Sequence, residues 1–256
     1  WRAIEHCKTN DRSSATPSNT GVRFKSDPGS VVRPMGDRRG PNDHRSDPPP
    51  SPAPLDRMAR PPRCFAPGQT LHLVQRGNNR STCFADDADR VVYLGMLAEL
   101  AGTTRCAVHA YVLMGNHVHL LVTPETPNAP SSLMQRIGMR FAAYVNRRHQ
   151  RTGTLWEGRF RSSIVDTDDY VVSCHRYIEL NPVRAGIVAR PDEYRWSSHL
   201  ANIGATAPGF LQPHPSVTAL GRTPDAARAA YRALFDRPLG EAVLGLLRQG
   251  MGSNRA

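Results

Sequence analysis

Two histidines stand inside an otherwise apolar segment, "AYVLMGNHVHLLVT", which covers residues 110–123. Side chains of a β-strand alternate between its two faces, so His117 and His119 would share one face while Val118 points to the other. Two neighbouring imidazoles on one face can bind the same divalent metal ion. A pair of buried, hydrogen-bonded histidines would give the same pattern, so the motif alone leaves both interpretations open.

A second pair of residues that could do chemistry lies further along the chain. Tyr177 and Asn181 are four positions apart, so they would share one face of a helix. The Asn181 amide offers an oxygen ligand, and the Tyr177 phenol could act as a nucleophile. In the alternative, Tyr177 packs in the core and Asn181 caps the helix before Pro182. Tyr144 is the second candidate nucleophile, although its helix precedes the last predicted strand.

Arginines and aromatic residues cluster shortly before Tyr177. The set consists of Arg147, Arg148, Arg151, Trp156, Arg159, Phe160 and Arg161. Arginine binds phosphate groups and aromatic rings stack on bases, so the cluster predicts a binding surface for single-stranded DNA. In the alternative, Trp156 belongs to the core and the arginines form a solvated edge.

The elements that must position these residues can be predicted in order along the chain. Residues 69–77 alternate as a strand does, and "GNN" ends that strand. Residues 86–104 have an acidic first turn and apolar residues at helical spacing, which predict a helix. Two apolar runs around Gly115 and Asn116 predict a hairpin of two further strands.

The second half of the same pattern follows the hairpin. Residues 130–153 predict a helix, residues 155–166 a fourth strand, and residues 167–186 a third helix. Asp166 or Thr167 would cap this third helix. The order β-α-β-β-α-β predicts an α+β fold with a ferredoxin-like antiparallel sheet, followed by the helix that carries Tyr177. Beyond it, the sequence predicts a helical C-terminal tail with two short helices between residues 212 and 256.

Composition limits the partners and the compartment of the chain, which has 256 residues and a formal net charge of +11. Ten of the 33 basic and seven of the 22 acidic residues fall within residues 1–57, which leaves 23 basic against 15 acidic residues beyond them. That excess favours a polyanion such as DNA or RNA, although a solvated basic surface would give it too. Five cysteines without a CxxC spacing argue against a disulfide framework and for a reducing, cytoplasmic compartment. The sequence contains no apolar run of membrane-spanning length.

Residues 1–57 differ in composition from the rest of the chain. They are rich in Pro, Ser, Asp and Arg without helical or strand periodicity, which predicts disorder. Both lysines of the chain, Lys8 and Lys25, lie in this segment. The first residue is Trp1, and ordered-looking sequence begins after Met58. Our hypothesis is that translation starts at Met58, and the alternative is a genuine disordered basic arm.

Three segments, in this order, resemble the REP-associated tyrosine transposases, which are single-tyrosine HUH transposases of bacterial insertion sequences. The segments are "YVLMGNHVHLLV", "RRHQRTGTLWEGRFRSSIVD" and "YIELNPVRAGIV". The resemblance runs from Met58 to about His199, where "YRWSSH" is also similar to the family. We therefore expect a leader over residues 1–57, a transposase domain over 58–200 and a helical extension over 201–256.

The resemblance implies a role for each site residue. His117 and His119 match the histidine–hydrophobic–histidine motif that holds a catalytic divalent metal, Mg²⁺ or Mn²⁺. Tyr177 matches the nucleophilic tyrosine on the helix after the last strand. Asn181 matches a position that usually supplies a further polar ligand, often Gln in relatives.

The implied activity is cleavage and rejoining of single-stranded DNA through a 5′-phosphotyrosine. Its implied substrates are hairpin-forming repeat ends, and the protein would act as a monomer or homodimer in the bacterial cytoplasm, at the nucleoid. Two other classes of function fit the same residues. The sheet could be a non-catalytic nucleic-acid-binding module, or the site could belong to a metal-dependent nuclease that uses water while Tyr177 is structural.

Overall fold

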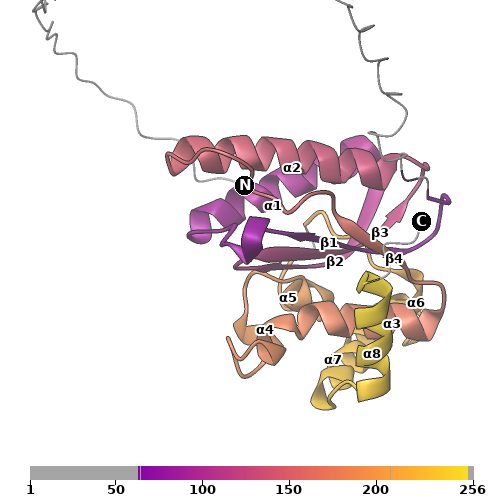
Figure 1. Cartoon of the computed structure of the whole chain (residues 1–256). Coiled ribbons are helices and arrows are strands. Elements are labelled where there is room, and N and C mark those ends of the chain that lie inside the picture. Colours follow the sequence, from indigo (N-terminus) through magenta and orange to yellow (C-terminus); the bar gives the residue numbers. More distant parts are fainter. Residues whose placement is uncertain (1–62, 64, 208, 253–256) are drawn as a thin grey trace, which may run out of the picture. The chain divides into compact units, whose positions relative to one another are not determined.

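The computed structural model of this chain describes residues 63, 65–207 and 209–252 (Figure 1). The predicted leader over residues 1–57 and the hypothetical start at Met58 lie outside the described residues. The strands are β1 (Leu71–Arg76), β2 (Cys106–Met114), β3 (His117–Pro124) and β4 (Arg161–Ile164). The α-helices are α1 (Asp87–Thr104), α2 (Ala129–Arg148), α3 (Asp168–Glu179), α4 (Asn181–Arg184), α5 (His199–Asn202), α6 (Pro215–Thr218), α7 (Pro224–Ala233) and α8 (Glu241–Gly252).

The four strands form one antiparallel sheet in the order β2-β3-β1-β4. The long helices α1 and α2 follow β1 and β3 in the chain, so the element order is β-α-β-β-α-β. This order and pairing are those of a ferredoxin-like sheet, and the predicted α+β fold class is confirmed.

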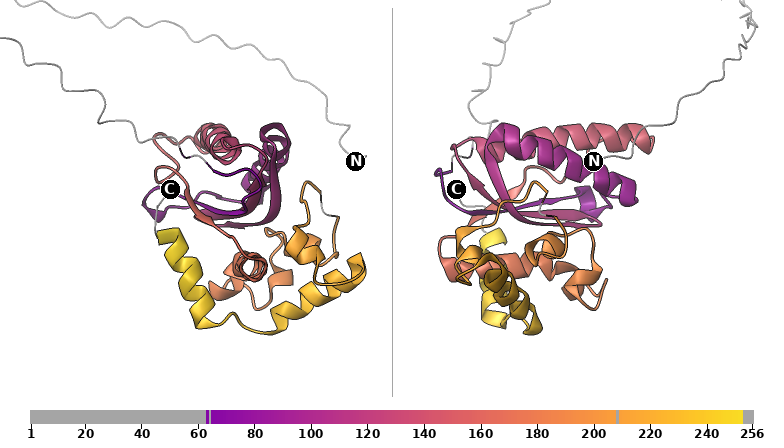
Figure 2. Two further views of the ribbon diagram at one scale, coloured as in Figure 1. Left: turned by 90° about the vertical axis from the view of Figure 1, so that its right-hand side faces the viewer. Right: turned by 180° about the vertical axis from the view of Figure 1, so that it is seen from behind.

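Helices cover both faces of this sheet (Figure 1). α1 and α2 lie on one face, and α3 lies on the other together with the shorter C-terminal helices. Two further views show the same layers, with α8 beside α3 (Figure 2). Because α3 covers the face opposite α1 and α2, side chains can meet between the sheet and α3 without disturbing the core under the two long helices.

Strand alternation divides apolar from polar side chains between the two faces. Leu73 and Leu120 are cross-strand partners, and both are fully buried on the face under α1 and α2. His72 and His119 point to the other face, where both rings lie near the aromatic ring of Tyr177 on α3. The apolar core and the histidine pair therefore occupy opposite sides of the same two strands.

The first long helix begins and ends where its sequence predicts. The Asp86 carboxylate accepts a hydrogen bond from the backbone N–H of Asp89, as an N-cap residue does. Arg105 ends the helix in the left-handed conformation, with φ of 57°. These two ends set the direction in which the chain enters β2.

The predicted extent of the fourth strand is wrong. Only Arg161–Ile164 pair with β1, although the sequence predicted a strand over residues 155–166. Trp156 makes an isolated bridge with Gly77, and Gly158 has a φ of +65°. A residue in the left-handed region cannot continue an extended strand, so the chain turns at Gly158 before β4 begins.

The predicted third helix over residues 167–186 is divided into α3 and α4. Its start is correct, because the Thr167 hydroxyl caps α3 by accepting from the backbone N–H of Tyr170. The two helices are separated at Leu180, with Pro182 in the first turn of α4. Proline has no N–H to donate to the carbonyl four residues earlier, so the α3 ladder ends here.

The C-terminal tail contains more helix than predicted. Among the described residues, α7 and α8 correspond to the two helices expected between residues 212 and 256, and α6 is an additional one. α6 has four residues, too few to produce a recognisable apolar period in the sequence. Among the described residues, no helix has both the length and the apolar character needed to cross a bilayer.

Candidate active site

The two histidines of the HxH motif lie side by side on β3. The centroids of the His117 and His119 rings are 5.0 Å apart. Their cross-strand partners on β1 are Arg76 and Val74, respectively. His119 is 3% exposed, whereas His117 is half-buried at the beginning of the strand. The structure thus places both rings on the sheet face that α3 covers.

A third histidine contacts this pair. His72 on β1 is fully buried, and its Nε2 lies 2.8 Å from Nδ1 of His119. The two rings are stacked, with centroids 5.1 Å apart. A neutral imidazole donates from one nitrogen and accepts at the other, so this hydrogen bond couples the tautomers of both rings. When His119 donates from Nδ1, its Nε2 keeps a lone pair that can bind a metal.

His117 is oriented by two asparagines. Its Nδ1 lies 2.6 Å from Oδ1 of Asn116, and an amide oxygen only accepts, so Nδ1 carries the proton. The Asn181 side chain also hydrogen-bonds His117. The contact of Nδ1 with Asn116 leaves Nε2 of His117 with a lone pair. The residues predicted as metal ligands, His117, His119 and Asn181, are therefore brought together.

The histidines of the site favour the neutral form. Burial, reinforced by the positive charge of Arg184, lowers the pKa of His72 to about 3. Burial, with Arg76 and Arg184 nearby, lowers the pKa of His117 to about 4. Burial and the neighbouring imidazoles hold the pKa of His119 well below its ordinary value. Neutral imidazoles have lone pairs available at neutral pH, which is the state that metal binding requires.

The donor set is sparse for a metal centre built by the protein alone. In the part of the chain that the structure describes, no three His, Cys, Asp or Glu side chains are grouped so that they could hold a metal ion. Two imidazole nitrogens and an amide oxygen nevertheless suit a divalent ion that keeps open positions for water or substrate.

Tyr177 faces the histidines from α3. Its ring centroid lies 6.0 Å from that of His119 and 5.9 Å from that of His72, both in edge-on geometry. Tyr177 is 5% exposed. It and Asn181 converge on the histidines, although the break at Leu180 places them on two helices instead of the single helix that was predicted.

The Tyr177 ring is covered by a cation. The guanidinium carbon of Arg184 lies 3.8 Å from the ring centroid, and Nη1 of Arg184 donates to the Tyr177 carbonyl at 3.0 Å. A groove of about 570 Å³ runs beside Asn181 and Arg184, with Glu241 and Arg248 of α8 on its other side. Positive charge thus lies both over the phenol ring and along the adjoining groove.

A buried carboxylate at the end of α3 binds this helix to its neighbours. Glu179 is fully buried and accepts hydrogen bonds at 2.6 to 2.9 Å from four side chains. The four donors are Ser198, His199, Asn202 and Tyr231. Burial alone would raise the pKa of Glu179, but the hydrogen bond and charge of His199 outweigh burial and lower it. This network connects the helix of Tyr177 to α5 and α7.

The structure divides the predicted arginine-rich cluster instead of presenting it as one surface. Arg148 is bound by both oxygens of Asp86 and by the buried Asp89, so its charge is largely compensated. Arg147 is exposed and Arg151 half-buried at the end of α2, the helix on the face opposite the histidines. The role of these residues in DNA binding stays a prediction.

The remaining members lie on both sides of the sheet. Trp156 is 8% exposed and its indole N–H donates to the Gly138 carbonyl at 3.0 Å, so it packs as core. Together with Arg159 and Phe160 it lines a groove of about 900 Å³ beside α2. Arg161 is exposed on β4 opposite Val74, the cross-strand partner of His119, and shares the face of the histidines.

Sequence reasoning missed His72 and Arg184. His72 lies in the alternating segment 69–77, but only the pairing of β1 with β3 brings it to His119. Arg184 lies in the quoted segment "YIELNPVRAGIV", seven positions after Tyr177, where one continuous helix would also place it near the tyrosine face. The spacing of Arg184 was a usable signal, whereas the position of His72 depends on a long-range pairing.

Parts of this chain are similar to known proteins. Residues 67–181 match the family model described as "Transposase IS200 like". A solved structure of a REP-associated tyrosine transposase bound to a REP hairpin is 21% identical, with a TM-score of 0.48, over 57% of this chain and 86% of that one. A protein from Deinococcus radiodurans R1 assigned as a transposase is 19% identical, with a TM-score of 0.33, over 50% of this chain and 92% of that one. A search of curated proteins gave no match.

The segment matched by the family model contains the whole sheet, the HxH motif and Tyr177, and it ends at Asn181. Through residues 67–181, this chain is similar to the IS200-like transposases.

Proposed function

We propose that this protein cleaves and rejoins single-stranded DNA through a covalent bond to Tyr177. One observation carries the proposal. The Tyr177 ring lies 6.0 Å from that of His119, and Asn181 hydrogen-bonds His117, so a phenol, two imidazoles and an amide from separate elements meet under one sheet face. The match of residues 67–181 to a transposase family model supports a strand-transfer reaction at this site.

His117, His119 and Asn181 would hold a divalent metal, Mg²⁺ or Mn²⁺. The hydrogen bond of His117 Nδ1 to Asn116 leaves Nε2 with a lone pair, and the contact of His119 Nδ1 with His72 leaves its own Nε2 for a ligand. When bound, such an ion neutralises and aligns a non-bridging phosphate oxygen. Hydrogen bonds from the nitrogen that does not bind the metal fix the orientation of histidine ligands.

The step at Tyr177 conserves bond energy. The Tyr177 oxygen forms a bond to phosphorus while the bond from phosphorus to the 3′ oxygen breaks. The proton that the phenol loses ends on the 3′ oxygen, so the products are a 5′-phosphotyrosine and a free 3′-hydroxyl. A second 3′-hydroxyl can reverse the step and join two strands, which hydrolysis by water would not allow.

In our proposal, Arg184 assists this step electrostatically. Its guanidinium lies over the Tyr177 ring and stabilises negative charge as it develops on the phenol oxygen. Its second contact, to the Tyr177 carbonyl, holds it in place. Arg184 thus supplies the nearby positive charge that a tyrosine nucleophile needs.

We propose single-stranded DNA with hairpin-forming repeat ends as the substrate. Arg76 and Arg161 lie on the strands beside the histidines, and Arg184 and Arg248 line the groove next to Asn181. Phosphates bound along these cations would pass the Tyr177 side of the sheet. A monomer or a homodimer would present the same site.

The experiment is a covalent-adduct gel with single-stranded DNA and Mn²⁺. Tyr177→Phe removes one oxygen and keeps the ring, so packing is retained while adduct and cleavage vanish together. Tyr144→Phe is the matched control, because Tyr144 stacks on Phe141 of α2, on the other side of the sheet. A chelator should abolish the adduct of the wild-type protein.

Each other outcome assigns a different function. Cleavage without an adduct identifies a nuclease that uses water, and binding without cleavage identifies a non-catalytic module. An adduct kept in Tyr177→Phe and lost in Tyr144→Phe would move the nucleophile to α2 and contradict the proposal.

A further inference from the structure

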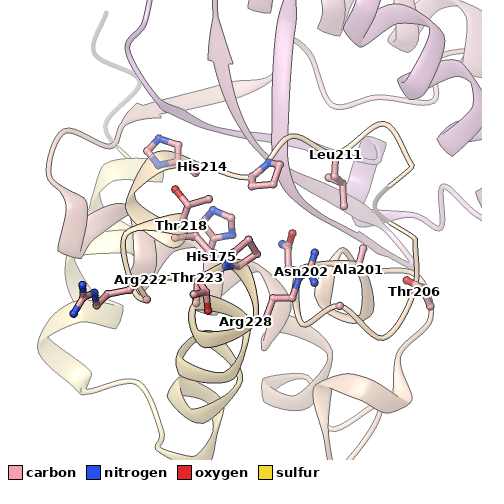
Figure 3. A pocket seen from close by; sticks show the side chains of 16 residues that line it. His175, Ala201, Asn202, Thr206, Leu211, His214, Thr218, Arg222, Thr223 and Arg228 are labelled. Atoms are coloured by element: carbon pink, nitrogen blue, oxygen red, sulfur yellow. The ribbon is translucent and has the colours of Figure 1, made fainter.

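A second cavity lies on the same side of the sheet as α3, among the C-terminal helices. Its volume is about 340 Å³, within the range of roughly 300–1,000 Å³ that small-molecule sites have. His175 of α3 lines it together with residues of α5, α6, α7 and their connections (Figure 3). Apart from His175, its lining residues lie beyond the segment that matches the transposase family, so the cavity is a feature of the C-terminal extension.

A buried imidazole with an unused nitrogen lines this cavity. His175 is 1% exposed, and its Nε2 has no hydrogen-bond partner among the described residues. Its Nδ1 lies 3.4 Å from the Tyr231 hydroxyl, and Tyr231 does not line the cavity. His175 lines the cavity, so its buried Nε2 is the ring nitrogen left to bind a ligand there.

The hydrogen bonds around Tyr231 determine the tautomer of His175. The Tyr231 hydroxyl donates its one proton to Glu179 at 2.9 Å, so the Nδ1–H of His175 donates to the Tyr231 oxygen. In this neutral tautomer, Nε2 carries a lone pair and can only accept a hydrogen bond or bind a metal. Burial lowers the pKa of His175 to about 3, so the ring stays neutral at physiological pH.

This chemistry excludes two classes of ligand at the bottom of the cavity. An anion would meet a lone pair instead of a donor. A metal ion lacks further ligands, because the described residues hold no group of three His, Cys, Asp or Glu suited to one. The buried end of the ligand must therefore present an N–H or O–H donor to His175.

The walls and the rim add two requirements. Apolar side chains line the walls, among them Leu211, Val217 and Ala227. Arg222 and Arg228 also line the cavity, and both are exposed. The partner of Arg228 is Asp225 at 3.2 Å in a solvent-exposed pair, which a phosphate can replace at little cost.

We infer that this cavity binds a nucleoside monophosphate unit, with an N–H edge of the base on His175 and the phosphate on the rim arginines. The apolar walls suit the faces of a planar base, and the charges at the rim suit its phosphate. The unit can come from a free nucleotide or from an unpaired nucleotide of a bound DNA strand. The inference does not depend on Tyr177, because no step of chemistry is involved.

Calorimetry and fluorescence anisotropy test the inference with two probes. One probe is 2′-deoxyadenosine 5′-monophosphate, and the other is a labelled single-stranded oligonucleotide. Thr218→Trp places a large ring at the exposed rim of the cavity and should block both forms of the ligand. His175→Phe keeps the ring and removes the acceptor, and Arg228→Gln removes one rim charge.

Binding through this cavity should weaken at least about tenfold in both Thr218→Trp and Arg228→Gln. The first variant blocks the cavity, and the second removes a hydrogen bond to a charged group, which contributes about a factor of ten to affinity. Arg136→Gln is the control, because Arg136 is an exposed arginine of α2 on the other sheet face. Binding measured in a Tyr177→Phe background should be unchanged, which keeps this test separate from that of cleavage. Thermal melting of each variant confirms that it is folded.

The two probes identify the source of the ligand. Saturable binding of the mononucleotide that is lost in Thr218→Trp assigns the cavity to a free nucleotide. Loss of oligonucleotide affinity in the same variants, without mononucleotide binding, assigns it to the DNA strand. If His175→Phe and Thr218→Trp change neither probe while both proteins are folded, the cavity holds only water and the inference is wrong.

Discussion

The Arg184 guanidinium lies over the ring of Tyr177, with its carbon 3.8 Å from the ring centroid, and also donates to the carbonyl of the same residue. This double contact connects α4 to α3 across the break at Leu180. The cation is therefore held at the phenol that faces the histidine cluster.

Arg184→Gln should slow formation of the covalent adduct by about 10- to 100-fold, because charge on the phenol oxygen loses its stabilising cation. Arg184→Lys keeps the charge but not the planar guanidinium, so its rate should lie between those of Arg184→Gln and the wild type. Single-turnover assays with labelled DNA measure this rate. Arg190→Gln, at an exposed arginine paired with Asp192, is the control. Equal rates in Arg184→Gln and wild type would show that Arg184 is only structural.

His72→Phe should reduce cleavage about 10- to 100-fold and raise the Mn²⁺ concentration required, although His72 binds no substrate in our proposal. The reason is that His119 Nδ1 loses its partner at 2.8 Å, so the orientation of the ring is no longer fixed. A Mn²⁺ titration of adduct formation separates a weaker metal requirement from misfolding. An unchanged titration curve would exclude an orienting role for His72.

Glu179→Gln should destabilise the fold by roughly 2–4 kcal/mol. A glutamine places an N–H₂ group among four donors, so at least one donor is left without an acceptor in a buried network. Urea unfolding measures the loss. Glu241→Gln is the control, because that carboxylate is 86% exposed on α8. A loss no greater than that of the control would contradict a stabilising role for the network.

The free energy of unfolding should decrease as the pH falls from about 6.5 towards 4. Burial lowers the pKa of His109 to about 4, and burial lowers that of His175 to about 3. Both rings take up protons near pH 6.5 when the chain unfolds, so acid favours the unfolded state. Each contributes a slope of about 1.4 kcal/mol per pH unit within this window.

His109→Gln tests this slope. Glutamine keeps an N–H that can donate to the Gln212 carbonyl, the partner of His109 Nδ1 at 2.7 Å, but it cannot be protonated. Urea unfolding at several pH values should show a slope smaller by about one proton in this variant. An identical slope would mean that His109 binds the same number of protons in the folded and the unfolded state, which would contradict its lowered pKa.

Local patterns were sufficient to predict most of the fold. The alternation in 69–77 and the Gly-Asn hairpin correspond to β1, β2 and β3, and the acidic first turn after Asp86 correctly marks the start of α1. These features depend on residues close together in the chain. The error at β4 has the opposite cause, because residues 155–160 look extended but turn at Gly158 to bury Trp156.

The candidate site was only partly predictable for the same reason. The period of a strand predicts that His117 and His119 share a face, but it does not identify the neighbouring strand. The contact of His72 with His119 follows from the register of β1 on β3. The salt bridges of Arg148 to Asp86 and Asp89 also join distant segments, so the sequence could not show that this arginine is already occupied.

The break at Leu180 has a consequence for comparing this chain with its relatives. In one continuous helix, the backbone distance from residue 177 to residue 181 would be fixed. An asparagine at position 181 would then end farther from the histidines than a glutamine would. Here α4 starts independently at Asn181, and the Asn181 amide reaches His117 although it is one methylene shorter than glutamine. The position of Asn181 is therefore set by a four-residue helix, whereas Tyr177 is held by α3.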